Sequence, residues 1–302
     1  MKTKAFIYII IAGILWGTSG IFVHFLTPYG FSSVQMTAVR GAVSFIGMAI
    51  YALISDKKLF KIKPTDLLFF APIGATLFFT AFLYYTAMTM TSVSTAVVLM
   101  YMAPVYVMIF SVLFLGESFS KMKLFSVCAM LIGCALVSGI IGGIEFDVLG
   151  IIFGFLSGVS YATYNILTKV ALRGKRNAVS MTVYSFLFMA IIAICVANPA
   201  DIVDKAVANP WPAIPLLIGI GIATFVIPYF LYTLAMRDLP AGTASALGIV
   251  EPMAATIFSV LFLEEKLGWL PAIGIVLILV AVFMLGKAED HSKKEETEQN
   301  TE

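Results

Sequence analysis

Charged residues are scarce in this sequence. Of its 302 residues, 12% are Asp, Glu, Lys or Arg, whereas 61% are hydrophobic. A soluble domain carries about 25% charged residues and about half apolar ones. A water-soluble chain of this length could not bury so much apolar surface, so the composition excludes that class and indicates an integral membrane protein.

Cysteine and the common catalytic motifs are also missing or sparse. The three cysteines, Cys128, Cys134 and Cys195, lie in apolar stretches without paired spacing, which favours neither a disulfide framework nor a metal site. No HExxH, paired-aspartate, GxSxG or nucleotide-binding loop occurs. We therefore expect a protein that is not an enzyme, that needs no cofactor and that binds no nucleic acid.

Long apolar runs dominate the chain instead. Stretches of about 18 or more residues with almost no charge can cross a bilayer as helices. Ten such spans are predicted, with counts of nine or eleven as alternatives: Ala5–Leu26, Val34–Ile54, Leu67–Met90, Val93–Leu115, Leu124–Ile140, Leu149–Ala171, Ser180–Ala197, Ile214–Met236, Ala241–Leu263 and Trp269–Gly286.

The positive charges favour ten spans with both termini in the cytoplasm. In that topology the inner segments carry sixteen Lys and Arg residues and the outer loops carry two, Lys205 and Lys266, while Arg40 falls within a span. Such a bias follows the positive-inside rule. Removing or adding one helix would destroy it.

The phrase IFSVLFL occurs twice, at Ile109–Leu115 and at Ile257–Leu263, 148 positions apart. At this offset Ala71–Glu117 and Gly219–Glu265 are identical at 19 of 47 positions without a gap. Apolar composition would produce matches of Leu, Phe and Val, but would not align Pro, Tyr, Thr and Glu. We infer two copies of a five-helix unit, 1–145 and 146–286.

Because five is an odd number, the second copy enters the membrane from the opposite side. Inverted repeats of this kind are typical of secondary transporters, which bind substrate near the midplane between the copies. The predicted fold is therefore an all-α integral membrane protein with ten transmembrane helices in two inverted five-helix repeats.

Three stretches can be compared with known families: LWGTSGIF in the first span, FLYYTAMTMTSVSTAVVLMYMAPV across the third and fourth, and FLYTLAMRDLPAGTASALGIVEPMAATIFSVLFLEEKL across the eighth and ninth. They resemble the drug/metabolite transporter superfamily, specifically its EamA family, and the resemblance extends over about Phe6–Leu285. It implies export or uptake of a small metabolite, such as an amino acid, amine, carboxylate or drug, without naming one.

Glu251 is the sole acid deep in a predicted span, and Pro252 follows it. An ionisable residue in the membrane is costly and usually faces a cavity or a partner, so Glu251 is a candidate to bind substrate or a proton. The alternative is structural: Glu251 could bond backbone groups freed by Pro252 or pair with Arg40. The sequence leaves both open.

Pro104 and Pro252 occupy matched central positions of the fourth and ninth spans. Proline removes a backbone donor and clashes with the preceding turn, which predicts a kink or break. Kinks at equivalent places in inverted copies suggest gating elements, although plain packing would explain them equally well.

Aromatic and amide side chains form the second group of candidates. In the sixth span, Tyr161, Tyr164, Asn165 and Thr168 share one helical face. For any single aromatic residue core packing is the better explanation, but the set indicates a shared cavity. The predicted substrate-binding residues are Trp16, Tyr84, Tyr101, Tyr161, Asn165, Tyr232 and Glu251.

Two further regions have simpler expectations. Arg40 and Lys169 are expected to extend their long side chains to the membrane interface. The tail, 287–302, has almost no apolar residues, so we expect a disordered cytosolic segment.

The sequence thus predicts a secondary transporter in a plasma membrane of the bacterial inner-membrane type, working by alternating access, with export as the expected direction. Its partners would be a small-molecule substrate, membrane lipids and, as a candidate coupling ion, the proton. It would act as a monomer or homodimer. The alternatives are a channel or a non-transporting sensor or scaffold.

Overall fold

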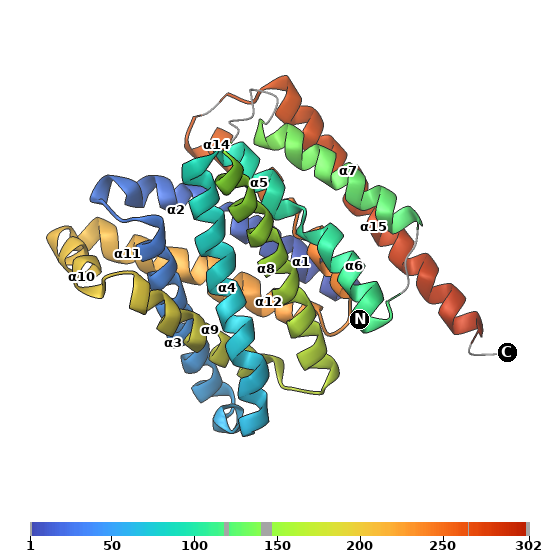
Figure 1. The fold of residues 1–302 in the computed structure, drawn as a ribbon, viewed down its shortest axis with the longest axis horizontal. Helices are drawn as coiled ribbons and strands as arrows, with labels where there is room; N and C mark the ends of the chain where they lie inside the picture. Colours follow the sequence, from blue (N-terminus) through green and yellow to red (C-terminus); the bar gives the residue numbers. More distant parts are fainter. Residues whose placement is uncertain (1, 118–120, 140–146, 265, 300–302) are drawn as a thin grey trace.

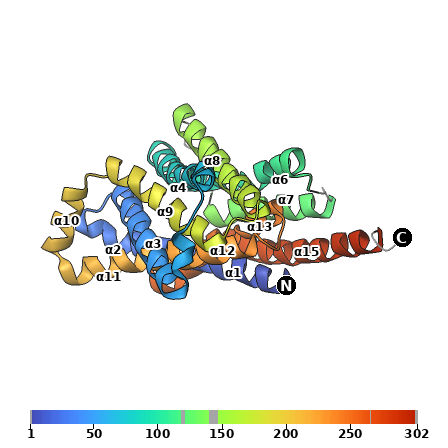
Figure 2. The same cartoon turned by 90° about the horizontal axis from the view of Figure 1, so that it is seen from below.

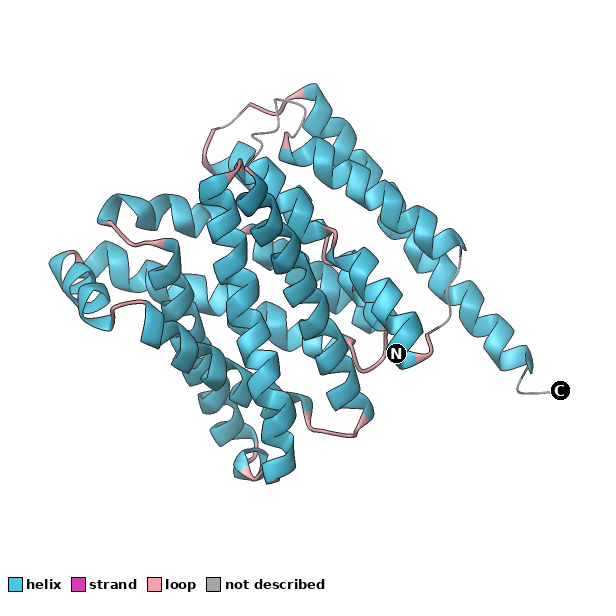
Figure 3. Ribbon diagram, viewed as in Figure 1, coloured by secondary structure: helices cyan, strands magenta, loops and turns pink. Residues whose placement is uncertain are grey.

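The computed structural model describes residues 2–117, 121–139, 147–264 and 266–299. Within these residues, ten helical spans are long and apolar enough to cross a membrane, which confirms the predicted number (Figures 1 and 3). Their helices are α1 (Lys2–Gly17) with α2 (Ser19–Leu26), α3 (Ser33–Ser55), α4 (Pro64–Met90), α5 (Val93–Tyr101) with α6 (Ala103–Leu115), α7 (Lys121–Ser138), α8 (Val148–Arg173), α9 (Ala178–Val196), α11 (Pro210–Gly221) with α12 (Ile227–Ala235), α13 (Ala241–Leu247) with α14 (Val250–Phe262), and α15 (Trp269–Gln299).

Two spans are interrupted just before the prolines from which a kink or break was predicted. The fourth span breaks at Met102, so Pro104 lies in the first turn of α6. The ninth breaks at Gly248 and Ile249, three residues before Pro252. The carbonyl of Gly248 cannot receive a bond from Pro252, and it accepts one from the Glu251 N–H instead, at 3.0 Å.

The eighth span is also irregular, which the sequence analysis did not predict. Between α11 and α12 it contains one π-helical stretch, η4 (Ile222–Val226), directly before Pro228 in the first turn of α12. Single π-helical turns inside longer helices are frequent at functional sites.

The two halves of the chain pack mainly against each other. Helix α1 contacts α12 and α14, and in the other half α8 contacts α4, α5 and α6. Helix α3 pairs with α9, and α7 pairs with α15 (Figure 1). Exchanging helices of the first half with their counterparts in the second reproduces these pairings, as a pseudo-twofold relation between two inverted repeats requires.

Close helix contacts depend on small residues where the halves meet. A Cβ added at Gly133 of α7 would lie 2.9 Å from the Gly274 carbonyl oxygen of α15, and one at Gly274 would lie 2.6 Å from the Gly133 carbonyl oxygen. Glycine therefore lets these backbones touch, a common means of helix association in lipid, where burial of apolar surface supplies little driving force.

Helix α1 begins and helix α15 ends on the same side of the bundle, which we call the terminal face, and the end of α15 projects beyond it (Figures 1 and 2). The short helix α10 (Pro199–Ala208) lies at the opposite face. The tail from 287, predicted to be disordered, is helical in its described part, where α15 continues to Gln299. The tail is rich in Glu and Lys, which favour helix even without apolar residues.

Candidate functional site at the centre of the bundle

An aromatic cluster occupies the junction of the two halves. It consists of Trp16 of α1, Tyr161 and Tyr164 of α8, and Tyr229 and Tyr232 of α12. The Trp16 ring lies 5.1 Å from the Tyr229 ring and 5.4 Å from the Tyr232 ring, centroid to centroid, and Tyr161 stacks on Tyr164 at 5.9 Å. These spacings are typical of favourable ring pairs.

Asn165 connects the cluster to the helix backbone. Its amide nitrogen donates to the Tyr161 carbonyl at 2.7 Å, and its amide oxygen accepts a hydrogen bond from the Tyr232 hydroxyl. Both Asn165 and Tyr232 are fully buried. A satisfied polar link of this kind fixes the orientation of α8 relative to α12.

Glu251 lies in the first turn of α14, beside the cluster. A Cβ on the neighbouring Gly248 would be 3.7 Å from the Tyr161 hydroxyl and 4.0 Å from the Trp16 ring. The Glu251 carboxyl group interacts electrostatically with Tyr101, Tyr84 and Arg40. The Tyr101 hydroxyl faces the Glu251 carboxyl group within hydrogen-bonding reach, although outside strict hydrogen-bond geometry, whereas the buried Trp16 indole N–H has no partner among the described residues.

The structure thus brings the predicted site residues to one region. Trp16, Tyr161, Asn165 and Tyr232 lie in or directly against the cluster. Among the described ring contacts, Tyr84 and Tyr101 do not join it, but both lie within electrostatic range of Glu251. The sequence analysis missed Tyr229 and Phe225. Their rings lie 4.9 Å apart, centroid to centroid. Phe225 lies in η4, the irregular stretch that the sequence did not predict, and it is buried there.

The expectation for Arg40 is wrong. Its side chain does not extend to the interface but is 4% exposed, and Nη1 donates to the Tyr85 hydroxyl at 2.7 Å. The guanidinium carbon lies 5.8 Å from the centroid of the Phe225 ring. Arg40 makes no direct ion pair with Glu251 in the described part of the chain.

A cavity of about 230 Å³ opens on the side of α14 that faces away from the termini. Ala255, Thr256 and Ser259 of α14 contribute to its wall, together with Val137 of α7 and residues before and in α15. Ala255 is one helical turn after Glu251. The cavity therefore begins one turn from the acid, on the half of the bundle opposite the terminal face.

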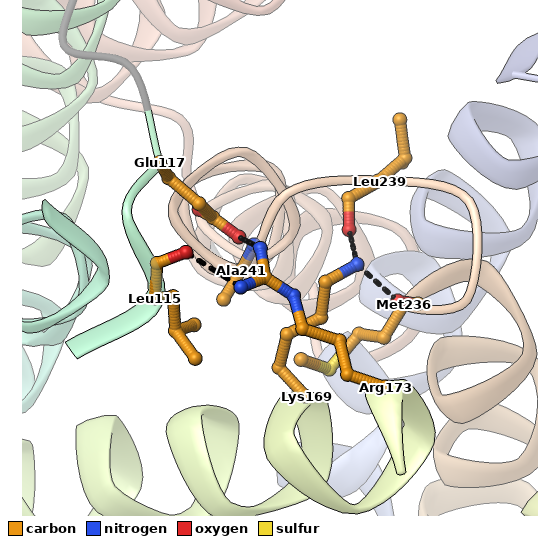
Figure 4. Close-up of polar contacts among 7 residues, drawn as sticks. All are labelled: Leu115, Glu117, Lys169, Arg173, Met236, Leu239 and Ala241. Atoms are coloured by element: carbon orange, nitrogen blue, oxygen red, sulfur yellow. Dashed lines mark hydrogen bonds and ion pairs between the residues drawn. The ribbon is translucent and has the colours of Figure 1, made fainter. Parts of the chain in front are cut away.

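At the terminal face, a group of polar contacts, which we call the polar seal, joins helices from both halves (Figure 4). Arg173 of α8 donates to the Leu115 carbonyl at 2.6 Å and pairs with Glu117 at 3.3 Å. Glu117 also accepts the Ala241 N–H at 3.2 Å. The seal consists of Glu117, Arg173 and Lys169 with their backbone partners. It joins the end of α6, helix α8 and the turn between α12 and α13.

Lys169 completes the seal and corrects a second expectation. It is 7% exposed and does not extend to the membrane interface. Its amine donates to the carbonyls of Met236 at 2.7 Å and Leu239 at 2.5 Å, so it binds the α12–α13 turn from inside. Hydrogen bonds donated by a charged group are stronger than those between neutral groups.

Comparison with known proteins identifies the class. The chain matches the EamA-like transporter family over residues 3–139 and again over 148–287, and so belongs to that family. It is 29% identical over 276 residues to an uncharacterised transporter of Archaeoglobus fulgidus, covering 91% of this chain and 94% of the relative. It is 23% identical to the uncharacterised transporter YwfM of Bacillus subtilis, covering 96% of both chains. One crystal structure shares the fold, with a TM-score of 0.79 at 17% identity over 96% of this chain and 99% of that one. The protein is therefore a multi-pass membrane transporter.

Proposed function

We propose that the protein is a secondary transporter that exports a small organic metabolite across the plasma membrane by alternating access. The observation that supports this best is Glu251, the acid at the centre of the described spans, beside an aromatic cluster built from both halves of the chain. Such a site suits a ligand with an apolar body and a polar or charged group.

The proposed cycle uses the two ends of the bundle differently. In this cycle the polar seal would close the terminal face, and the excess of positive charge on that face supports its placement in the cytoplasm, while the cavity along α14 lies toward the other side. The broken helices α5–α6 and α13–α14 would act as the gates, because their ends bend without breaking further backbone hydrogen bonds. Glu251 would contact a cationic group or carry a proton.

The test begins without a known substrate. Metabolites are profiled in cells with and without the protein, and compounds whose levels change are then offered to membrane vesicles. Glu251→Gln should abolish the flux or its pH dependence between pH 5 and pH 8 while the protein remains in the membrane. Asp204→Asn, which neutralises an exposed acid in α10, is the matched control and should transport normally. Unchanged flux in Glu251→Gln would remove Glu251 from the mechanism.

A further inference from the structure

Arg40 carries a buried positive charge that the described protein compensates only in part. The residue lies seven positions into α3, inside a membrane span, with 4% of its surface exposed. Arginine does not lose its proton in proteins. A charge buried in this way is costly unless it meets an opposite charge or a full set of hydrogen-bond acceptors.

The hydrogen bonds of the guanidinium occupy only one of its edges. Nη1 donates to the Tyr85 hydroxyl, whereas Nε and Nη2 are buried without a partner among the described residues. The N–H bonds of Nε and Nη2 point in parallel along one edge of the guanidinium plane. This edge is the one that grips both oxygens of a carboxylate in paired hydrogen bonds.

The guanidinium lies next to residues of the central site. Phe225 of η4 lies under the guanidinium and contacts Tyr229, the ring that also contacts Trp16. Both Arg40 and Glu251 act electrostatically on Tyr229. Arg40 and Glu251 therefore flank the same aromatic wall without forming a direct ion pair, so the acid does not satisfy the free edge.

We infer that the free edge of Arg40 is a subsite for an anionic group of the transported compound, most simply a carboxylate, and that Arg40 determines specificity for it. This rests on the proposed transport function and extends it, because the aromatic wall beside Arg40 would hold the apolar body of the same compound. A single anionic group would satisfy two donors and neutralise the buried charge.

Three compounds with one apolar body test the charge preference: 3-phenylpropionate, 3-phenylpropylamine and 3-phenylpropan-1-ol. Their binding to the purified protein is followed by the fluorescence of its tryptophans, since Trp16 lies in the cluster. The wild type should bind the carboxylate more tightly than the alcohol. Arg40→Gln should weaken carboxylate binding about tenfold or more, as loss of charged hydrogen bonds implies, and leave the alcohol unaffected.

Arg237→Gln, which neutralises an exposed arginine, is the matched control and should bind as the wild type does. If Arg40→Gln does not fold, Arg40→Lys decides, because lysine keeps the charge but loses the paired donors and should bind the carboxylate several-fold more weakly. Equal binding of carboxylate and alcohol by the wild type, or undiminished carboxylate binding in both variants, would overturn the subsite. If the subsite is overturned but metabolite flux persists, the proposed transport function is retained. If binding depends on Arg40 but no flux is found, the transport function is refuted and the subsite is retained.

Discussion

The Glu117 carboxylate lies 3.3 Å from the Arg173 guanidinium, and this contact joins the first half of the chain to the second at the terminal face. The same oxygen of Glu117 accepts the Ala241 N–H at 3.2 Å, so one acid holds both α8 and the start of α13 (Figure 4). If the bundle opens at this face during transport, these contacts must break.

Glu117→Gln should therefore shift the protein toward opening at the terminal face. The Arg173 side chain is 46% exposed, and a partly exposed ion pair contributes only about 0.2–1 kcal/mol, so we expect a shift of about 1.4- to fivefold. The measurement is the alkylation rate of a cysteine placed at Thr243, which lines a small cavity next to Glu117, in a background without the native cysteines. Asp238→Asn, in an exposed position of the α12–α13 turn, is the control, and an equal rate in all three proteins would contradict the seal.

Two glycines at the first span give a matched test of packing. A Cβ at Gly17 would lie 2.7 Å from the Ala254 side chain and 2.8 Å from the Ala255 backbone nitrogen, whereas a Cβ at Gly20 would meet nothing within 4 Å. Gly17→Ala should destabilise the protein by about 1–3 kcal/mol through overpacking of α1 on α14. Gly20→Ala should be neutral or slightly stabilising, because alanine favours helix. Melting in detergent measures both, and a similar loss in the two variants would show that α1 and α14 are not in close contact.

The hydrogen bond between Tyr232 and Asn165 predicts a loss of stability when only the Tyr232 hydroxyl is removed. Tyr232→Phe keeps the ring but leaves the fully buried Asn165 amide oxygen without its donor. An unsatisfied buried acceptor costs about 1–3 kcal/mol, so the melting temperature should fall by several degrees. The exposed Tyr51 supplies the comparison, since Tyr51→Phe removes a hydroxyl that makes no such contact. If both variants melt alike, the hydrogen bond is absent in solution.

The sequence predicted the spans well because length and apolarity are local properties. It also placed the breaks in the fourth and ninth spans, since Pro104 and Pro252 act on their own helices. The expectations for Arg40 and Lys169 were wrong because a rule for isolated helices cannot include partners from other helices. These partners are Tyr85 and two carbonyls of the α12–α13 turn. One signal was available: Arg40 lies well inside its span, which is far for a side chain to extend.

The opposite face has its own polar contact, and it should depend on pH. Asp201 of α10 accepts hydrogen bonds from Lys205 and from Gln35 of α3, each at 2.5 Å, and these bonds, with Lys205 first, lower the pKa of Asp201 below its ordinary value of 3.8. A lowered folded pKa means that the contact stabilises the fold above pH 3.8 and is lost as pH falls through the folded value. The protection of the α10 amides against hydrogen exchange, corrected for the intrinsic rate, should therefore be the same at pH 5 and pH 7. Asp201→Asn should lower that protection. Equal protection in the variant would mean that the contact does not hold α10.

The orientation of the two halves gives the most direct test of the fold in cells. The loop around Lys58 follows the second span and the segment around Asp204 follows the seventh, and five spans lie between them. Since five is odd, the two segments should lie on opposite sides of the membrane, and the positive charges of 57–63 predict a cytoplasmic position for that loop. In a background without the native cysteines, a membrane-impermeant maleimide applied to intact cells should label Asp204→Cys and not Lys58→Cys, while both should react after the cells are opened. Labelling of both in intact cells, or of Lys58→Cys alone, would contradict the inverted repeat or the cytoplasmic placement of the termini, respectively.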